Sequence, residues 1–82
     1  MIAVMAVFHV FVDGPVDRSP EGMQRLAEAM SQRYGLPATE LVARMTKGRF
    51  RVKANIDHKT ASAYIRDLEK IGARAVIEEA RD

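Results

Sequence analysis

Five cationic side chains and no acidic one lie between Arg44 and Lys53 of this 82-residue chain. Three of them, Arg49, Arg51 and Lys53, alternate with apolar residues. A row of cations can bind the phosphates of a nucleic acid or the carboxylates of an acidic protein. Because successive side chains of a β-strand point to opposite faces, the pattern is equally typical of a strand with one solvated face. Whether the row is a binding surface or only a solvated strand face depends on the elements that surround it.

Little else in the sequence predicts catalysis or metal binding. The chain has no Cys, and its two His residues, His9 and His58, have no cluster of carboxylates beside them. His9 is either a half-exposed strand residue or a pH-sensitive binding residue on an open sheet face. Asp13 and Asp17 flank Gly-Pro-Val and are typical of a turn. We therefore predict a protein that is not an enzyme and has no catalytic residues, cofactor or metal.

Three Met residues, Met23, Met30 and Met45, fall on the apolar sides of two predicted helices. Their flexible side chains either fill the core or line an adaptable groove for a partner. Asp13, in the turn after the first apolar run, is predicted to border the same groove.

The pattern of apolar residues, caps and turns predicts six elements. Residues 1–12 are apolar, rich in Val and Phe, too short for a membrane span and without the flanks of a signal peptide, so we expect a buried strand. Ser19 and Pro20 predict the start of a helix, and Gly35 predicts its end. Asp57 is expected to cap the last helix. After the first strand and a loop over 13–18 we expect helices over 20–34 and 37–47, a strand over 49–54, a helix over 58–71 and a strand over 73–79, with fraying after residue 79.

These elements predict one α+β domain over residues 1–82, ordered β-α-α-β-α-β. The first strand is the most apolar, so we place it in the middle of a three-stranded antiparallel sheet, with the strand over 49–54 on one side and the strand over 73–79 on the other. All three helices then cover one face. The other face is expected to carry the residues of a possible partner-binding surface: Arg49, Arg51, Lys53, Arg74, His9 and Phe11.

Three interpretations of this basic face remain open. Cations on an edge strand can simply deter aggregation. They can instead bind an acidic protein, or a single-stranded nucleic acid whose bases stack on aromatic rings. Sheets that recognise RNA stack bases on two or three aromatic residues, and here Phe11 is alone.

A set of residues at the ends of these elements links the chain to known proteins. It comprises the apolar strand Val7–Val12, Gly35 and Leu36 before the second helix, Ser19, Pro20, Glu21 and Gly22 at the first helix, and Lys53, Asn55, Ile56, Asp57, Ala61, Leu68, Glu69, Gly72, Ala73, Val76 and Ile77 in the last third. This set, over residues 7–79, resembles the carboxy-terminal domain of the bacterial ribosomal stalk protein and the ClpS adaptor fold. The resemblance implies the fold and an adaptor-like role. The functional motifs of those families are not matched: the turn is Val12-Asp13-Gly14-Pro15, and Met45 stands where the adaptors have a His.

Charge is distributed unevenly along the chain. Residues 1–41 carry three bases and five acids, and residues 42–82 carry ten bases and six acids, which indicates a polar partner. We predict a small cytoplasmic bacterial protein, monomeric or weakly dimeric and without membrane association, that serves as a non-enzymatic adaptor or protein–protein interaction domain. The alternatives are weak nucleic-acid binding through the basic sheet face and self-association through it.

Overall fold

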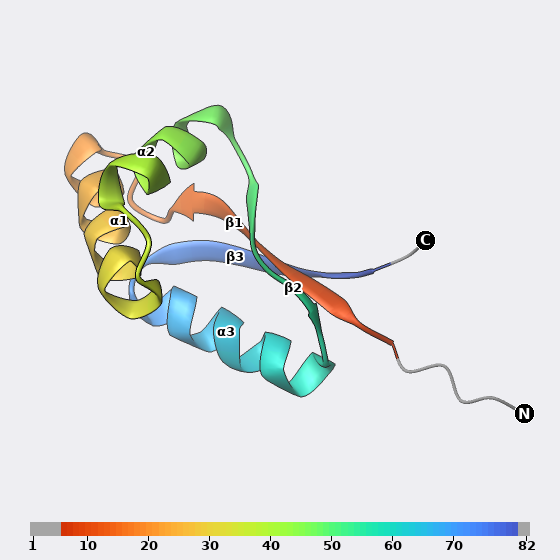
Figure 1. Cartoon of the computed structure of the whole chain (residues 1–82). Helices are drawn as coiled ribbons and strands as arrows, with labels where there is room; N and C mark the ends of the chain where they lie inside the picture. Colours follow the sequence, from red (N-terminus) through yellow and green to blue (C-terminus); the bar gives the residue numbers. More distant parts are fainter. Residues whose placement is uncertain (1–5, 81–82) are drawn as a thin grey trace, which may run out of the picture.

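The computed structural model describes residues 6–80, which form three strands and three helices (Figure 1). These are β1 (Phe8–Pro15), α1 (Pro20–Tyr34), α2 (Ala38–Lys47), β2 (Phe50–Ile56), α3 (His58–Lys70) and β3 (Ala73–Glu79). The predicted order of elements is confirmed. The start of the predicted first strand, at residues 1–5, and the end of the predicted frayed segment, at residues 81 and 82, lie outside the described residues.

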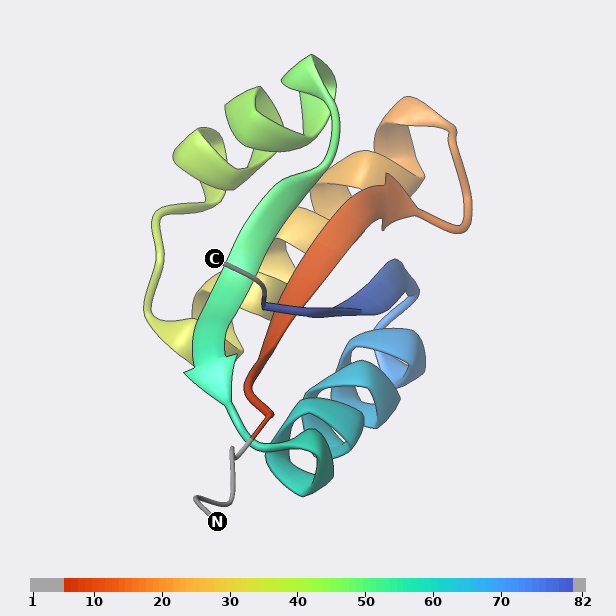
Figure 2. The ribbon, with the colours of Figure 1, turned by 90° about the vertical axis from the view of Figure 1, so that its right-hand side faces the viewer.

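The sheet has the predicted order β2-β1-β3, with β1 antiparallel to both neighbours. Val10 and Val12 of β1 are fully buried against a single core. Every helix contributes to this core, through Leu26, Ala27, Met30, Leu41, Met45, Ala61 and Leu68. The helices lie on one side of the sheet, and Figure 2 shows the sheet from the other side. The predicted α+β fold is therefore confirmed, and it leaves one sheet face without a helix.

α1 begins and ends at the residues that its sequence predicts. The Ser19 hydroxyl accepts a hydrogen bond from the Gly22 N–H (3.1 Å), and Pro20 stands in the first turn, where its missing N–H costs nothing. At the other end Gly35 adopts a left-handed conformation (φ 72°) and donates its N–H to the Ser31 carbonyl. Local chemistry thus fixes both ends of this helix.

α3 is held mainly by packing. Asp57 precedes the helix in the extended conformation of a cap, as predicted, and its carboxylate faces Thr60, whose side chain lowers the pKa of Asp57. Ala61 and Leu68 are fully buried in the core. The predicted position of the cap is therefore confirmed, and tertiary packing supplies most of the stability of the helix.

β1 continues to Pro15, beyond the predicted end at residue 12. A bulge explains the difference: the pairing with β3 shifts by one residue between Val12 and Gly14, so that Asp13 is the extra residue. The loop predicted over 13–18 therefore begins later. As a consequence the strand, rather than a loop, positions the Asp13 carboxylate.

β2 shows the predicted alternation with an irregular end. Phe50, Val52 and Ile56 pack against the core and Ala54 is half-buried, whereas Arg51, Lys53 and Asn55 are exposed. One register shift against β1 lies beside Asn55, which adopts a left-handed conformation (φ 57°) that Asn tolerates better than most residues. A second shift lies between Arg51 and Lys53. The Asn55 N–H donates a hydrogen bond to Nδ1 of His9 (3.2 Å). The strand runs over 50–56 rather than the predicted 49–54 because this bulge prolongs the pairing.

Candidate functional site

The sheet face opposite the helices, which we call the open sheet face, is turned toward the viewer in Figure 2. The strand register, the alternating exposure along β2 and the contacts of Arg49 and His9 with Phe11 place the six predicted residues there. The four cations are exposed, and the two aromatic residues are half-buried. Phe11 pairs with Arg51 of β2 on one side and Val76 of β3 on the other, so it lies in the middle of the face. The face thus brings together Arg49, Arg51, Lys53, Arg74, His9 and Phe11.

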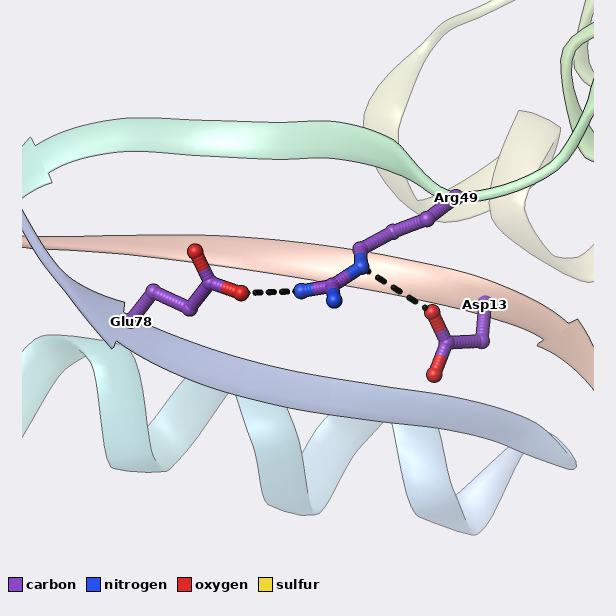
Figure 3. Close-up of polar contacts among 3 residues, drawn as sticks. All are labelled: Asp13, Arg49 and Glu78. Atoms are coloured by element: carbon purple, nitrogen blue, oxygen red, sulfur yellow. Dashed lines mark hydrogen bonds and ion pairs between the residues drawn. The ribbon is translucent and has the colours of Figure 1, made fainter.

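Arg49 crosses this face and forms ion pairs with two acids that lie on it, Asp13 and Glu78 (Figure 3). Its Nε lies 3.3 Å from Oδ1 of Asp13, and one of its terminal NH groups is paired with the Glu78 carboxylate. Its guanidinium carbon lies 5.3 Å from the centre of the Phe11 ring. Since all three charged side chains are 42–50% exposed, each ion pair contributes only about 0.2–1 kcal/mol. Arg49 therefore covers Phe11 and uses up the nearest carboxylates.

The other cations of the open sheet face are unpaired in the described part of the chain. Arg51, Lys53 and Arg74 make no ion pair within residues 6–80. Arg44, by contrast, pairs with Glu40 one turn earlier in α2 (2.7 Å). The basic stretch seen in the sequence is thus divided between paired and unpaired cations, a division that its composition does not reveal.

Both histidines have packing partners. His9 accepts the hydrogen bond from the Asn55 bulge, and its ring meets the edge of Phe11 with centres 6.2 Å apart. His58, in the first turn of α3, meets Phe8 in the same edge-on manner at 5.1 Å. Each imidazole therefore packs against a Phe ring of β1, and His9 also holds the bulge in β2 through its hydrogen bond with Asn55.

A pocket of about 350 Å³ opens where β1 ends, between α1 and α2. We call it the β1-end pocket; its lining residues are Asp13, Gly14, Pro15, Arg18, Met23, Met45 and Thr46. Met45, Gly14 and Pro15 are buried and form an apolar floor, and Met23 is half-buried beside them. Asp13, Arg18 and Thr46 are exposed at the rim.

The structure separates the residues predicted for the groove. Asp13, Met23 and Met45 line the β1-end pocket together, whereas Met30 is fully buried in the core and is not part of its lining. Arg18 and Thr46 were not predicted. Arg18 carries no pattern that distinguishes it from an ordinary loop residue, and Thr46 reaches the rim because α2 folds back on α1. Only the tertiary fold identifies them.

The described part of the chain holds neither a metal-binding cluster nor a helix able to span a membrane, and its polar groups near the start of α1 are engaged locally. Residues 6–80 hold no group of three His, Asp or Glu side chains close enough to bind a metal ion. The Ser19 hydroxyl is engaged at the start of α1, and the Ser19 N–H donates to the Asp17 carboxylate (3.0 Å), which lowers the pKa of Asp17. Within the same residues, none of the helices combines the length and the apolar character that crossing a bilayer requires.

The chain matches no protein-family model, no curated protein and no solved structure. The resemblance to the stalk domain and the ClpS adaptor therefore stays a prediction from sequence.

Proposed function

We propose that this protein is a non-enzymatic interaction domain that binds a segment of another protein, with an apolar side chain of that segment entering the β1-end pocket. The observation that carries the proposal is the meeting of Met23, Met45 and Asp13 in one hollow of about 350 Å³. Ligand pockets typically measure about 300–1,000 Å³, so this one suits a side chain better than a large cofactor.

The chemistry of the pocket supports a protein ligand. Met side chains are unbranched and polarizable, and they adapt to apolar groups of different shape. At the rim, Arg18 makes no ion pair within residues 6–80 and can donate to a backbone carbonyl of the segment. Thr46 offers a hydroxyl, which itself donates to the Val42 carbonyl (2.7 Å) and keeps its lone pairs for a further donor. An apolar floor with a few polar groups at the rim is the usual design of a binding pocket.

Nucleic-acid binding receives less support. A base needs an uncovered aromatic face for stacking, and the guanidinium of Arg49 lies over Phe11. Self-association through the open sheet face is opposed by its unpaired cations, which would face one another.

Panning a display library of short random peptides against the full chain tests the proposal. We expect the enriched peptides to share an apolar position and to bind measurably in fluorescence anisotropy. Met23→Glu places a charge at the apolar floor and should weaken binding by about tenfold or more, since burying an apolar side chain contributes about 1.5–3 kcal/mol.

Gln24→Glu is the matched control, because it adds the same charge to the exposed neighbouring position of α1. It should bind like the unmodified chain, and circular dichroism should show both variants folded. The proposal is wrong if no peptide is enriched, or if the enriched peptides bind Met23→Glu as tightly as they bind the unmodified chain.

A further inference from the structure

β2 is an edge strand with an unused side. Within residues 6–80 it pairs only with β1, so the backbone N–H and C=O groups along its outer edge have no strand partner. Arg51 and Lys53 project from this strand on the open sheet face, and both are exposed. Backbone groups and cations therefore lie side by side along one accessible border of the molecule.

The charges on this border are not balanced from within. The carboxylates on the open sheet face, Asp13 and Glu78, are both engaged by Arg49. Arg51 and Lys53 make no ion pair within the part of the chain that the structure describes. A ligand that brings two carboxylates would complement them, and no carboxylate of the face competes for the same cations.

We propose that the outer border of β2, with Arg51 and Lys53, is a docking site for an extended acidic segment of another protein, distinct from the ligand of the β1-end pocket. In a regular strand, residues two apart lie about 6.6–6.8 Å from each other. Arg51 and Lys53 keep the alternating exposure of such a strand, although the pairing of β2 with β1 shifts by one residue between them. An extended segment with Asp or Glu at every second position repeats this spacing, so two of its carboxylates meet the two cations at once. Its backbone lies along the unpaired edge.

The same observations disfavour the other occupants. A second copy of this chain, added antiparallel at β2, would bring Arg51 and Lys53 against the same cations, and like charges directly opposite each other are destabilising. A single-stranded nucleic acid could pair with the cations, but it would find Phe11 covered by Arg49. The cations thus exclude self-pairing and leave the edge available to an acidic strand.

Three labelled peptides of equal length, with Thr as the other residue, test the site in anisotropy titrations at low and high salt. The first has Glu at alternate positions, the second has the same Glu residues grouped in one half, and the third has Lys at alternate positions. We expect the alternating Glu peptide to bind roughly fivefold more tightly than the grouped one, and its binding to weaken with salt. The Lys peptide should not bind.

Charge reversal gives the decisive comparison. Arg51→Glu with Lys53→Glu should weaken binding of the alternating Glu peptide by roughly tenfold and create binding of the Lys peptide. Lys59→Glu with Arg66→Glu, at exposed positions of α3, makes the same change in net charge and should have little effect. Met23→Glu should also leave this binding intact, so failure here is separable from failure of the pocket.

Three results would overturn the proposal. The first is equal loss of binding in both charge-reversed variants, which would indicate attraction by net charge alone. The second is equal affinity for the alternating and grouped peptides, which would remove the strand geometry. The third is tighter binding of an oligothymidine than of the alternating Glu peptide at the same salt, which would identify a nucleic-acid surface.

Discussion

Gly22→Ala reverses the usual sign of a glycine substitution in a helix. Ala is favoured over Gly inside helices by about 1 kcal/mol, so helix propensity alone predicts that the change stabilises α1. Gly22, however, lies in the first turn, directly under the loop that enters the helix. A Cβ built there would lie 2.7 Å from Cγ and 2.8 Å from Cβ of Asp17, and closer still to the Asp17 carbonyl oxygen.

The backbone carbonyl decides the cost. Cβ atoms essentially never approach other atoms below 3.0 Å, and a carbonyl oxygen cannot rotate away as a side chain can. Asp17 would have to move, which strains the hydrogen bond from the Ser19 N–H to its carboxylate (3.0 Å). Overpacking of this kind costs about 1–3 kcal/mol, and a clash with backbone that cannot rotate away belongs at the upper end of this range. After subtracting the gain in propensity, we expect a net destabilisation of about 1–2 kcal/mol.

Urea denaturation followed by circular dichroism measures this effect. For a chain of this size a loss of 2 kcal/mol corresponds to a melting temperature lower by about 8–16 °C. Gln24→Ala, at an exposed position of the same helix, is the control and should stay within about 0.5 kcal/mol of the unmodified chain. A Gly22→Ala protein as stable as the unmodified chain, or more stable, would refute the close packing of the loop on α1.

The remaining predictions concern two titratable side chains, Tyr34 and Asp17. Tyr34→Phe should raise the free energy of unfolding by about 1 kcal/mol, because the Tyr34 hydroxyl is buried with no hydrogen-bond partner in residues 6–80, while stacking on Tyr64 is retained; a loss of stability would contradict this. Burial also raises the pKa of Tyr34 above 10.0. The stability that this shift contributes is complete below pH 10.0 and is lost as pH rises through the pKa of the folded state. The melting temperature of Tyr34→Phe should therefore depend less on pH in the alkaline range. The backbone and hydroxyl of Ser19 lower the pKa of Asp17 below 3.8. The stability that this shift contributes is present above pH 3.8 and is lost as pH falls through the lower pKa of the folded state. The melting temperature of Asp17→Ala should therefore fall less steeply in acid, and an equally steep fall in both proteins would contradict the prediction.

The fold was predictable where local chemistry and burial agree. Ser19 and Gly35 mark the ends of α1 through hydrogen bonds within a few residues, and these are legible in the sequence. The apolar character of β1 placed it in the centre of the sheet, because a central strand buries more surface than an edge strand. The alternation of Arg51, Val52 and Lys53 likewise predicted which side chains face away from the helices.

The site was less predictable because its contacts join distant parts of the chain. Arg49 meets Glu78, 29 residues away, only once β2 and β3 lie on either side of β1. Glu78 lies opposite His9 on the open sheet face, but its pairing with Arg49 depends on how far the Arg49 side chain reaches. Met30 and Met45 are both buried in the core, yet only Met45 also lines the β1-end pocket, a difference set by how α2 packs against α1.

Asp13 connects the two proposed surfaces. As the extra residue of the β1 bulge, it borders the β1-end pocket and also holds Arg49 across the open sheet face. A ligand group that donates to the Asp13 carboxylate in the pocket competes with Arg49 for the same oxygens. Weakening that ion pair gives Arg49 more freedom to meet an acidic segment beside Arg51. Because coupling between sites is reciprocal, the acidic segment should then favour occupation of the pocket by the same factor. The bulge in β1, which carries the strand beyond its predicted end, is therefore the feature through which the two surfaces can act on each other.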